Sequence, residues 1–74
     1  MKQIDFKATG AHLKSLREKK GLSIRELADE FRFTNITTIY NWENGSYLPT
    51  LPRLFALARF YGVPAKSLLV LKDV

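Results

Sequence analysis

"SIRELADEFRFTNITTIYNWENG", residues 23–45, is the stretch that decides the fold of this 74-residue chain. Its first part predicts a helix, because Ser23 and Glu26 have the spacing of a capping box, in which each side chain binds the other residue's backbone N–H. Leu27, Ala28 and Phe31 follow at helical spacing. We therefore expect a helix that starts after Ser23 and packs one face inward.

The second part of the stretch has a mixed pattern. Its Thr, Ile and Tyr residues favour a strand by propensity, but Ile36, Ile39 and Trp42 recur every third position. This repeat predicts a helix from about Asn35 or Ile36 to Asn44, with a threonine or asparagine as its cap. The two helices and their short connection make a helix–turn–helix unit, of the size that docks its second helix in the DNA major groove. Because such helix pairs are common, spacing alone does not identify a function.

Three more helices complete the expected fold. One runs from about Asp5 to Lys20, another begins after Thr50 as its cap, and a short apolar one spans about Pro64 to Leu71. Gly10 lies inside the first of them and indicates the close approach of another helix. The remaining glycines read as helix stops: Gly21, Gly45 and Gly62.

No segment predicts a strand, so the expected fold class is all-α, a compact five-helix bundle in one domain over residues 1–74. We expect Trp42 in the core rather than stacked on a base. The positions expected to face inward are Phe6, Leu13, Leu16, Leu27, Ala28, Phe31, Ile36, Ile39, Trp42, Leu51, Leu54, Leu57 and Ala58.

Composition narrows the choice of partner. The net charge of +5 and a pI near 9.8 favour nucleic acid or an anionic membrane surface. The cations are scattered over several helices rather than gathered on one amphipathic face, which disfavours the membrane. With no cysteine, no signal-peptide pattern and no long apolar run, we expect a cytoplasmic protein.

Enzymatic chemistry is not expected. The chain has one histidine, His12, and its carboxylates are predicted on exposed helix faces or at caps. It has neither a glycine-rich phosphate loop nor a histidine pair at metal-ligand spacing. We therefore expect no enzyme activity, no metal, no cofactor and no small-molecule ligand.

Three segments together resemble the Xre/Cro family of phage-repressor-type helix–turn–helix proteins: "LKSLREKKGLSIRELADEF", "TIYNWENG" and "LPTLPRLFALARFYGVPAKSLL". The resemblance covers roughly Thr9 to Leu69. It implies a five-helix domain that binds double-stranded DNA with its third helix in the major groove, usually as a homodimer on a near-palindromic site.

The resemblance also assigns roles to residues. It implies that Arg17 pairs with Glu43 as a structural ion pair. The positions that match base-contacting ones are Ile36, Thr37 and Asn41. The residues expected to contact the DNA backbone, by resemblance or by flanking charge, are Arg25, Arg32, Asn35, Thr38, Asn44, Ser46, Tyr47 and Arg53.

The chain departs from the family pattern at two places. Ile24 stands where a polar residue is usual at the start of the second helix, so one backbone contact is expected to be missing. The connection "FRFTN" lacks the usual glycine and makes the stretch between Leu27 and Glu43 one residue longer. The third helix is therefore expected to be tilted or entered differently.

From Phe33 to Pro52 the only formal charge is Glu43, so the expected reading helix carries no cation. Cations bind phosphates, whereas bases are read by hydrogen bonds and methyl contacts. Asn41 suits adenine, and Thr37 and Ile36 offer methyl groups to thymine, so we expect an A·T-containing half-site.

The expected function is sequence-specific regulation of transcription. A repressor is favoured because the sequence shows no domain for sensing a ligand or recruiting polymerase. Two alternatives stay open. One is the DNA-binding antitoxin of a toxin–antitoxin pair, with "SLLVLKDV" as the candidate toxin-binding segment. The other is a protein-interaction module that kept the fold without DNA binding, which Ile24 and the uncharged helix favour and the net charge disfavours.

Overall fold

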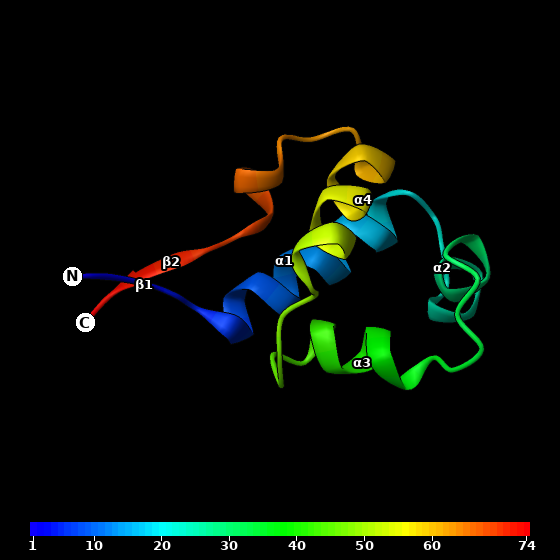
Figure 1. The fold of residues 1–74 in the computed structure, drawn as a ribbon, viewed down its shortest axis with the longest axis horizontal. Helices are drawn as coiled ribbons and strands as arrows, with labels where there is room; N and C mark the ends of the chain where they lie inside the picture. The colour runs from blue at the N-terminus through cyan, green and yellow to red at the C-terminus, as the bar shows by residue number, and fades with distance from the viewer.

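The computed structural model describes residues 1–74 and shows four α-helices with a small two-stranded sheet (Figure 1). In chain order the elements are β1 (Lys2–Ile4), α1 (Phe6–Lys19), α2 (Ile24–Glu30), α3 (Thr37–Glu43), α4 (Leu51–Tyr61), the 3₁₀ turn η1 (Ala65–Leu68) and β2 (Leu71–Asp73). α1 and α4 lie at the centre, α3 runs along one side, and α2 and the two strands occupy opposite ends. None of the helices is long and apolar enough to cross a membrane.

The capping box predicted at the start of α2 is confirmed. Ser23 Oγ accepts a hydrogen bond from the Glu26 N–H at 3.0 Å, and Glu26 Oε1 accepts one from the Ser23 N–H at 2.9 Å. The hydrogen bonds to Ser23 lower the pKa of Glu26. At the start of α1, Asp5 Oδ1 caps the Ala8 N–H at 2.9 Å. Polar side chains thus satisfy N–H groups at both helix starts.

The start of α4 corrects two expectations. Thr50 occupies the N-cap position, but its side chain makes no capping hydrogen bond. Pro52, in the first turn, has no N–H to donate to it. Leu51 was expected to face inward and is 64% exposed, while the inward face of α4 begins at Leu54. Phe6, the first residue of α1, was also expected in the core and is 43% exposed. Both misplaced residues are the first of their helices.

All four α-helices end in the same backbone motif. In each, one residue takes a positive φ, and the next N–H donates to the carbonyl five residues earlier. Three of the four left-handed positions are the glycines predicted as stops, Gly21, Gly45 and Gly62. The fourth is Arg32, with φ 59°. The α2–α3 connection, which has no glycine, therefore ends its helix in the same way, but with an arginine in a backbone conformation that is unfavourable for residues with a Cβ.

The expected fifth helix, Pro64 to Leu71, is wrong beyond one turn. Only Ala65–Leu68 is helical, as a 3₁₀ turn, and Leu69 is already extended with φ −93° and ψ 133°. The Val70 N–H then donates to Thr9 Oγ1 at 2.9 Å, while the Val70 carbonyl accepts from the Asp5 N–H at 2.7 Å. A short apolar run fits a helix or a strand, and here partners at the start of α1 select the strand.

The expectation of a strand-free fold is therefore also wrong. β1 and β2 pair antiparallel, with Lys2 opposite Asp73, Gln3 opposite Lys72 and Ile4 opposite Leu71. The two strands form a ribbon that brings both chain ends to one tip (Figure 1). Lys2 Nζ and Asp73 Oδ2 form an exposed ion pair at 3.0 Å on this ribbon. The fold is mostly helical, with this small sheet in place of the fifth helix.

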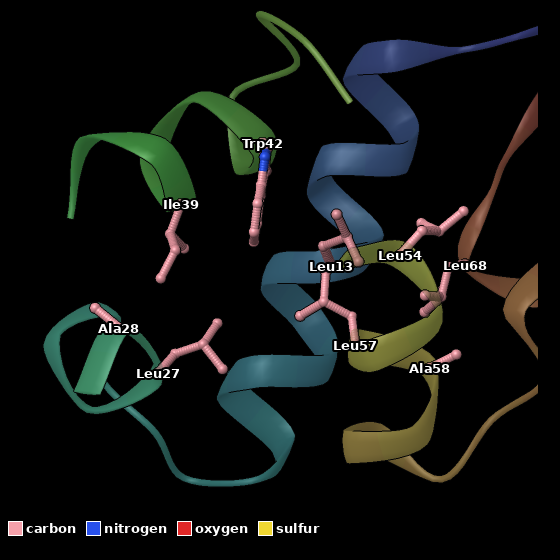
Figure 2. Close-up of a cluster of buried hydrophobic side chains, with 9 residues drawn as sticks. All are labelled: Leu13, Leu27, Ala28, Ile39, Trp42, Leu54, Leu57, Ala58 and Leu68. Atoms are coloured by element: carbon pink, nitrogen blue, oxygen red, sulfur yellow. The ribbon is translucent and has the colours of Figure 1, made fainter. Parts of the chain in front are cut away.

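The core lies where the four helices face one another (Figure 2). Ile39 and Leu68 are fully buried, so α3 and η1 both contribute to it. Trp42 is 3% exposed, which confirms that it packs in the core. The buried hydrophobic residues are Leu13, Leu27, Ala28, Ile39, Trp42, Leu54, Leu57, Ala58 and Leu68.

Gly10 lets α3 approach α1 closely, as its place inside the helix predicts. It is fully within α1 and buried. A Cβ at this position would lie 2.5 Å from the carbonyl oxygens of both Trp42 and Glu43. Since these are backbone atoms of α3, they cannot rotate away as a flexible side chain can. Gly10 therefore sets the distance between α1 and the helix that carries the candidate site.

We expect Gly10→Ala to destabilise the protein by about 1–3 kcal/mol, because α3 must move away from α1 to admit the methyl group. This loss runs against the gain of up to ~1 kcal/mol that alanine brings to a helix interior. Urea denaturation would measure it. Ala11→Gly, at the exposed neighbouring position, gives the propensity term with reversed sign. A Gly10→Ala protein more stable than wild type would contradict the close approach.

Arg32→Gly should stabilise the protein by about 0.5–1 kcal/mol, because a side chain in the left-handed conformation costs about 1–2 kcal/mol and glycine recovers most of it. Arg32→Ala is the matched control, since it removes the same charge and keeps the Cβ. The free energies of unfolding of the two variants should differ by about this amount. Equal values would show that the arginine is not strained.

Candidate nucleic-acid interface

α3 buries one side and exposes the other. Ile39 and Trp42 point into the core. Thr37 and Asn44 are exposed and Asn41 is half-buried, and these three residues, spaced by four and three positions, lie on the opposite face. Two of the predicted base-contacting residues, Thr37 and Asn41, are thus brought together on one accessible surface. No formal charge lies on this face of α3.

The third predicted base-contacting residue, Ile36, lies at the edge of this surface. It occupies the N-cap position of α3, is half-buried and packs against the core, so only part of its side chain faces outward. The preceding residue supplies the cap instead, because Asn35 Oδ1 accepts the Thr37 N–H at 2.8 Å. Asn35 is exposed, and its amide nitrogen makes no hydrogen bond within the protein. Thr38, in the first turn, is half-buried.

The segment that follows α3 folds back over its end. Asn44 Oδ1 accepts hydrogen bonds from both the N–H and the Oγ of Ser46, at 2.9 and 2.6 Å. Tyr47 is 43% exposed, and its hydroxyl accepts a hydrogen bond from Asn41 Nδ2 at 3.3 Å. Three predicted backbone-contacting residues, Asn44, Ser46 and Tyr47, therefore form one hydrogen-bonded loop beside Asn41.

The structure brings Arg17 and Glu43 together behind this surface. Arg17 Nε and Nη2 donate to the two carboxylate oxygens at 2.8 and 3.0 Å, and Nη1 donates to the Leu22 carbonyl at 2.7 Å. The two side chains are only 8% and 6% exposed. The hydrogen bond to Glu43 raises the pKa of Arg17. One guanidinium thus links α1, the α1–α2 connection and the last residue of α3.

Tyr61 completes the surroundings of the pair. Burial raises the pKa of Tyr61 to about 12, and the negative charge of Glu43 adds to the rise. The phenol therefore stays neutral, so it brings no second negative charge to the Glu43 carboxylate.

The predicted cations flank α3 and do not lie on it. Arg25 is exposed on α2, and Arg32 is exposed in the α2–α3 connection. Arg53, in the first turn of α4, places its guanidinium 4.6 Å from the centre of the Phe33 ring. This cation–π contact offsets the unfavourable position of a cation at a helix start.

The longer α2–α3 connection is packed, not loose. Phe33 lies edge-on to Trp42, with ring centroids 5.7 Å apart, and also contacts Phe31 at 5.9 Å. Ile24, the apolar residue at the start of α2, likewise packs against the core. Both departures from the family pattern therefore have structural partners within the chain.

Tyr40 is a surface residue that sequence reasoning missed. It is 52% exposed and lies three positions after Thr37, so helical spacing alone places it beside the predicted base-contacting residues. It also lines a cleft of about 420 Å³ whose other lining residues are Lys14, Arg17, Ile24, Glu43 and Asn44. Lys14 on α1 is thus a further cation next to this surface, and its nearness depends on the packing of α1 against α3.

We expect Glu43→Ala to lower the free energy of unfolding by more than ~1 kcal/mol, because it leaves the Arg17 guanidinium buried without its counter-charge. Lys2→Ala is the control: it breaks the exposed Lys2–Asp73 pair and should change stability by less than about 1 kcal/mol. Thermal melts of the two variants compare the pairs directly. Equal melting temperatures for Glu43→Ala and wild type would remove the pair from any structural role.

Comparison with known proteins identifies matches that include α2, α3 and α4. The helix-turn-helix family HTH_3 matches residues 13–68. The DNA-binding domain of BldD from S. venezulae is 34% identical, with a TM-score of 0.73, over 86% of this chain and 94% of that domain. A crystal structure of the DNA-binding domain of BldD gives 33% identity and a TM-score of 0.74 over 88% of this chain and 93% of that one. No curated protein sequence matches this chain.

Proposed function

This chain belongs to the Xre/Cro-type helix-turn-helix family, and from that membership we propose that it binds double-stranded DNA sequence-specifically and regulates transcription. The family is one of DNA-binding domains and not of enzymes. The observation that carries the proposal is the exposed, uncharged face of α3, which is held against α1 by the Arg17–Glu43 ion pair and has cations nearby on α2, α4 and the α2–α3 connection.

In this proposal α3 enters the major groove and reads bases. Asn41 offers an amide that can bond adenine N6 and N7 together, and Thr37 offers a methyl group and a hydroxyl. Ile36 adds a partly exposed methyl contact for thymine at the same end of α3. A half-site that contains A·T pairs suits these three side chains.

The surrounding residues bind the phosphates. Arg25 on α2 and Arg32 in the α2–α3 connection supply charge near α3, and Arg53 supplies a third cation that also stacks on Phe33. Neutral donors near α3 fix the register of the protein on the duplex. They are Asn35, Thr38, Asn44, Ser46 and Tyr47.

The finer parts of the proposal are repression and a homodimer on a pseudo-palindromic site. A protein that occupies the major groove excludes polymerase from the same stretch, so binding alone can repress. Two copies related by a twofold axis would read two half-sites about one helical turn, ~34 Å, apart. Footprinting on a selected site, together with the mass of the complex, tests both.

One structural observation bears on each of the two alternative functions, the antitoxin and the protein-interaction module. Leu71 and Val74, in the segment considered for toxin binding, are 55% and 63% exposed, which leaves an apolar surface for a protein partner. For the interaction module, Ile24 is a weaker argument than the sequence indicates, because its packing against the core gives it a structural reason. Selection of bound sites from random duplex DNA separates them. Enrichment of a motif supports DNA binding, and its absence favours the module.

Asn41→Ala and Thr37→Ala should each cost about 1–3 kcal/mol on the preferred site and little on random DNA, because they remove base contacts and leave phosphate contacts intact. Titration against specific and random duplexes measures the two affinities. If both variants bind the preferred site as tightly as wild type, α3 is not the reading helix.

Arg25→Ala serves as the complementary control. It should weaken binding to all sequences about equally and reduce the slope of log K against log salt by up to ~1. Lys72→Ala removes a cation from the ribbon, away from α2 (Figure 1), and should leave the slope unchanged. A slope that falls equally for both would indicate attraction by net charge alone.

A further inference from the structure

The amide of Asn41 is not free on the surface. Its Nδ2 donates a hydrogen bond to the Tyr47 hydroxyl at 3.3 Å, between a residue in the last turn of α3 and one in the loop that follows. It is the only hydrogen bond between two side chains that joins α3 to this loop. The residue best suited to read adenine is therefore already bound to a neighbour.

Tyr47 itself is held in place by the backbone. The Asn41 carbonyl accepts hydrogen bonds from the Ser46 and Tyr47 N–H groups, at 3.0 and 3.5 Å. Gly45 turns the chain with φ 82°, and a Cβ there would lie 2.8 Å from Lys7 Cα, so this loop is pressed against the start of α1. The hydroxyl of Tyr47 is thus presented to Asn41 by a constrained turn.

The chemistry of the amide makes this contact informative. An asparagine amide has two N–H groups and one acceptor oxygen. Donating one N–H to the phenol leaves the other N–H and Oδ1, which is the pair that adenine N7 and N6 require. A phenol can accept from the amide nitrogen, as it does here, or donate to Oδ1. When its O–H donates to a phosphate, its oxygen can only accept, so Nδ2 must lie on the tyrosine side and one of the two orientations of the Asn41 amide is selected.

We propose that Tyr47 is a positioning residue that fixes the Asn41 amide in the orientation that reads adenine. This inference rests on the proposed function, since it assigns a role in base recognition by α3. The Tyr47 hydroxyl keeps its own proton, and that O–H can donate to a phosphate of the same strand region. Tyr47 would then contact a DNA phosphate and, through Asn41, also affect the recognition of one base pair.

The test is Tyr47→Phe, which keeps the ring and removes only the hydroxyl. Site selection with wild type and with Asn41→Ala first identifies the base pair whose preference depends on Asn41. Duplexes with that pair replaced are then titrated with wild type and Tyr47→Phe. We expect discrimination at that base pair to fall about three- to tenfold in Tyr47→Phe, the amount that one hydrogen bond supplies. Discrimination at the other positions should stay unchanged.

The double variant separates positioning from simple phosphate contact. In the Asn41→Ala background, Tyr47→Phe should cause no further loss of discrimination, because there is no amide left to orient. Tyr40→Phe is the matched control: it removes a hydroxyl from the same exposed face that has no hydrogen bond to Asn41. It should leave discrimination at the Asn41 base pair as it is in wild type.

Three outcomes would count against the proposals: one against the DNA-binding function and two against the positioning role of Tyr47. If wild type selects no motif, the proposed DNA-binding function fails before Tyr47 is tested. If wild type selects a motif and Tyr47→Phe keeps full discrimination at the Asn41 base pair, the positioning role is overturned. The same holds if Tyr47→Phe weakens all duplexes equally in both backgrounds, which is the behaviour of a phosphate contact only. A thermal melt of Tyr47→Phe that matches wild type excludes misfolding as the cause of any loss.

Discussion

The guanidinium of Arg17 is the group on which the arrangement of this protein depends. Burying a cation is costly, and the cost is met only when hydrogen bonds and a counter-charge surround it. Arg17 donates hydrogen bonds to groups in two different segments: the carboxylate of Glu43 at the end of α3, which is also its counter-charge, and the carbonyl of Leu22 in the α1–α2 connection. The two-pronged contact fixes direction, because both carboxylate oxygens must face the fork. Gly10 fixes the distance between the same two helices. Together, the Arg17–Glu43 contact and Gly10 set the position of α3 relative to α1. The orientation of the exposed face of α3 therefore depends on an ion pair that is buried behind it.

Much of this arrangement follows from the sequence because the signals are local. The capping box at Ser23 and Glu26 and the three glycine stops depend on neighbours within a few positions, and all occur as predicted. The apolar repeat through Ile39 and Trp42 identifies the inward face of α3, and hence Thr37 and Asn41 on the other face. Here hydrophobic spacing outweighs the strand propensity of the same residues.

The features that sequence reasoning missed are not encoded in a local pattern of residue types. The apolar run around Val70 becomes extended because Asp5 and Thr9, more than sixty residues away, offer it hydrogen bonds. The left-handed conformation of Arg32 cannot be read from a residue type that usually avoids it. The contact between Asn41 and Tyr47 exists only because the chain reverses at Gly45. For the segment around Val70 the composition permits a helix or a strand, and these distant contacts select the strand.

The ribbon of β1 and β2 also has a kinetic meaning. Lys2 and Asp73 are 71 positions apart, so pairing these strands closes almost the whole chain into a loop. Such a closure costs entropy that three residues per strand, largely exposed, recover poorly unless the helices have already brought the ends near each other. The ribbon should therefore form after the helical core and open before it. Its amide protons would exchange with solvent through local fraying, while those of α3 would wait for the core itself to open.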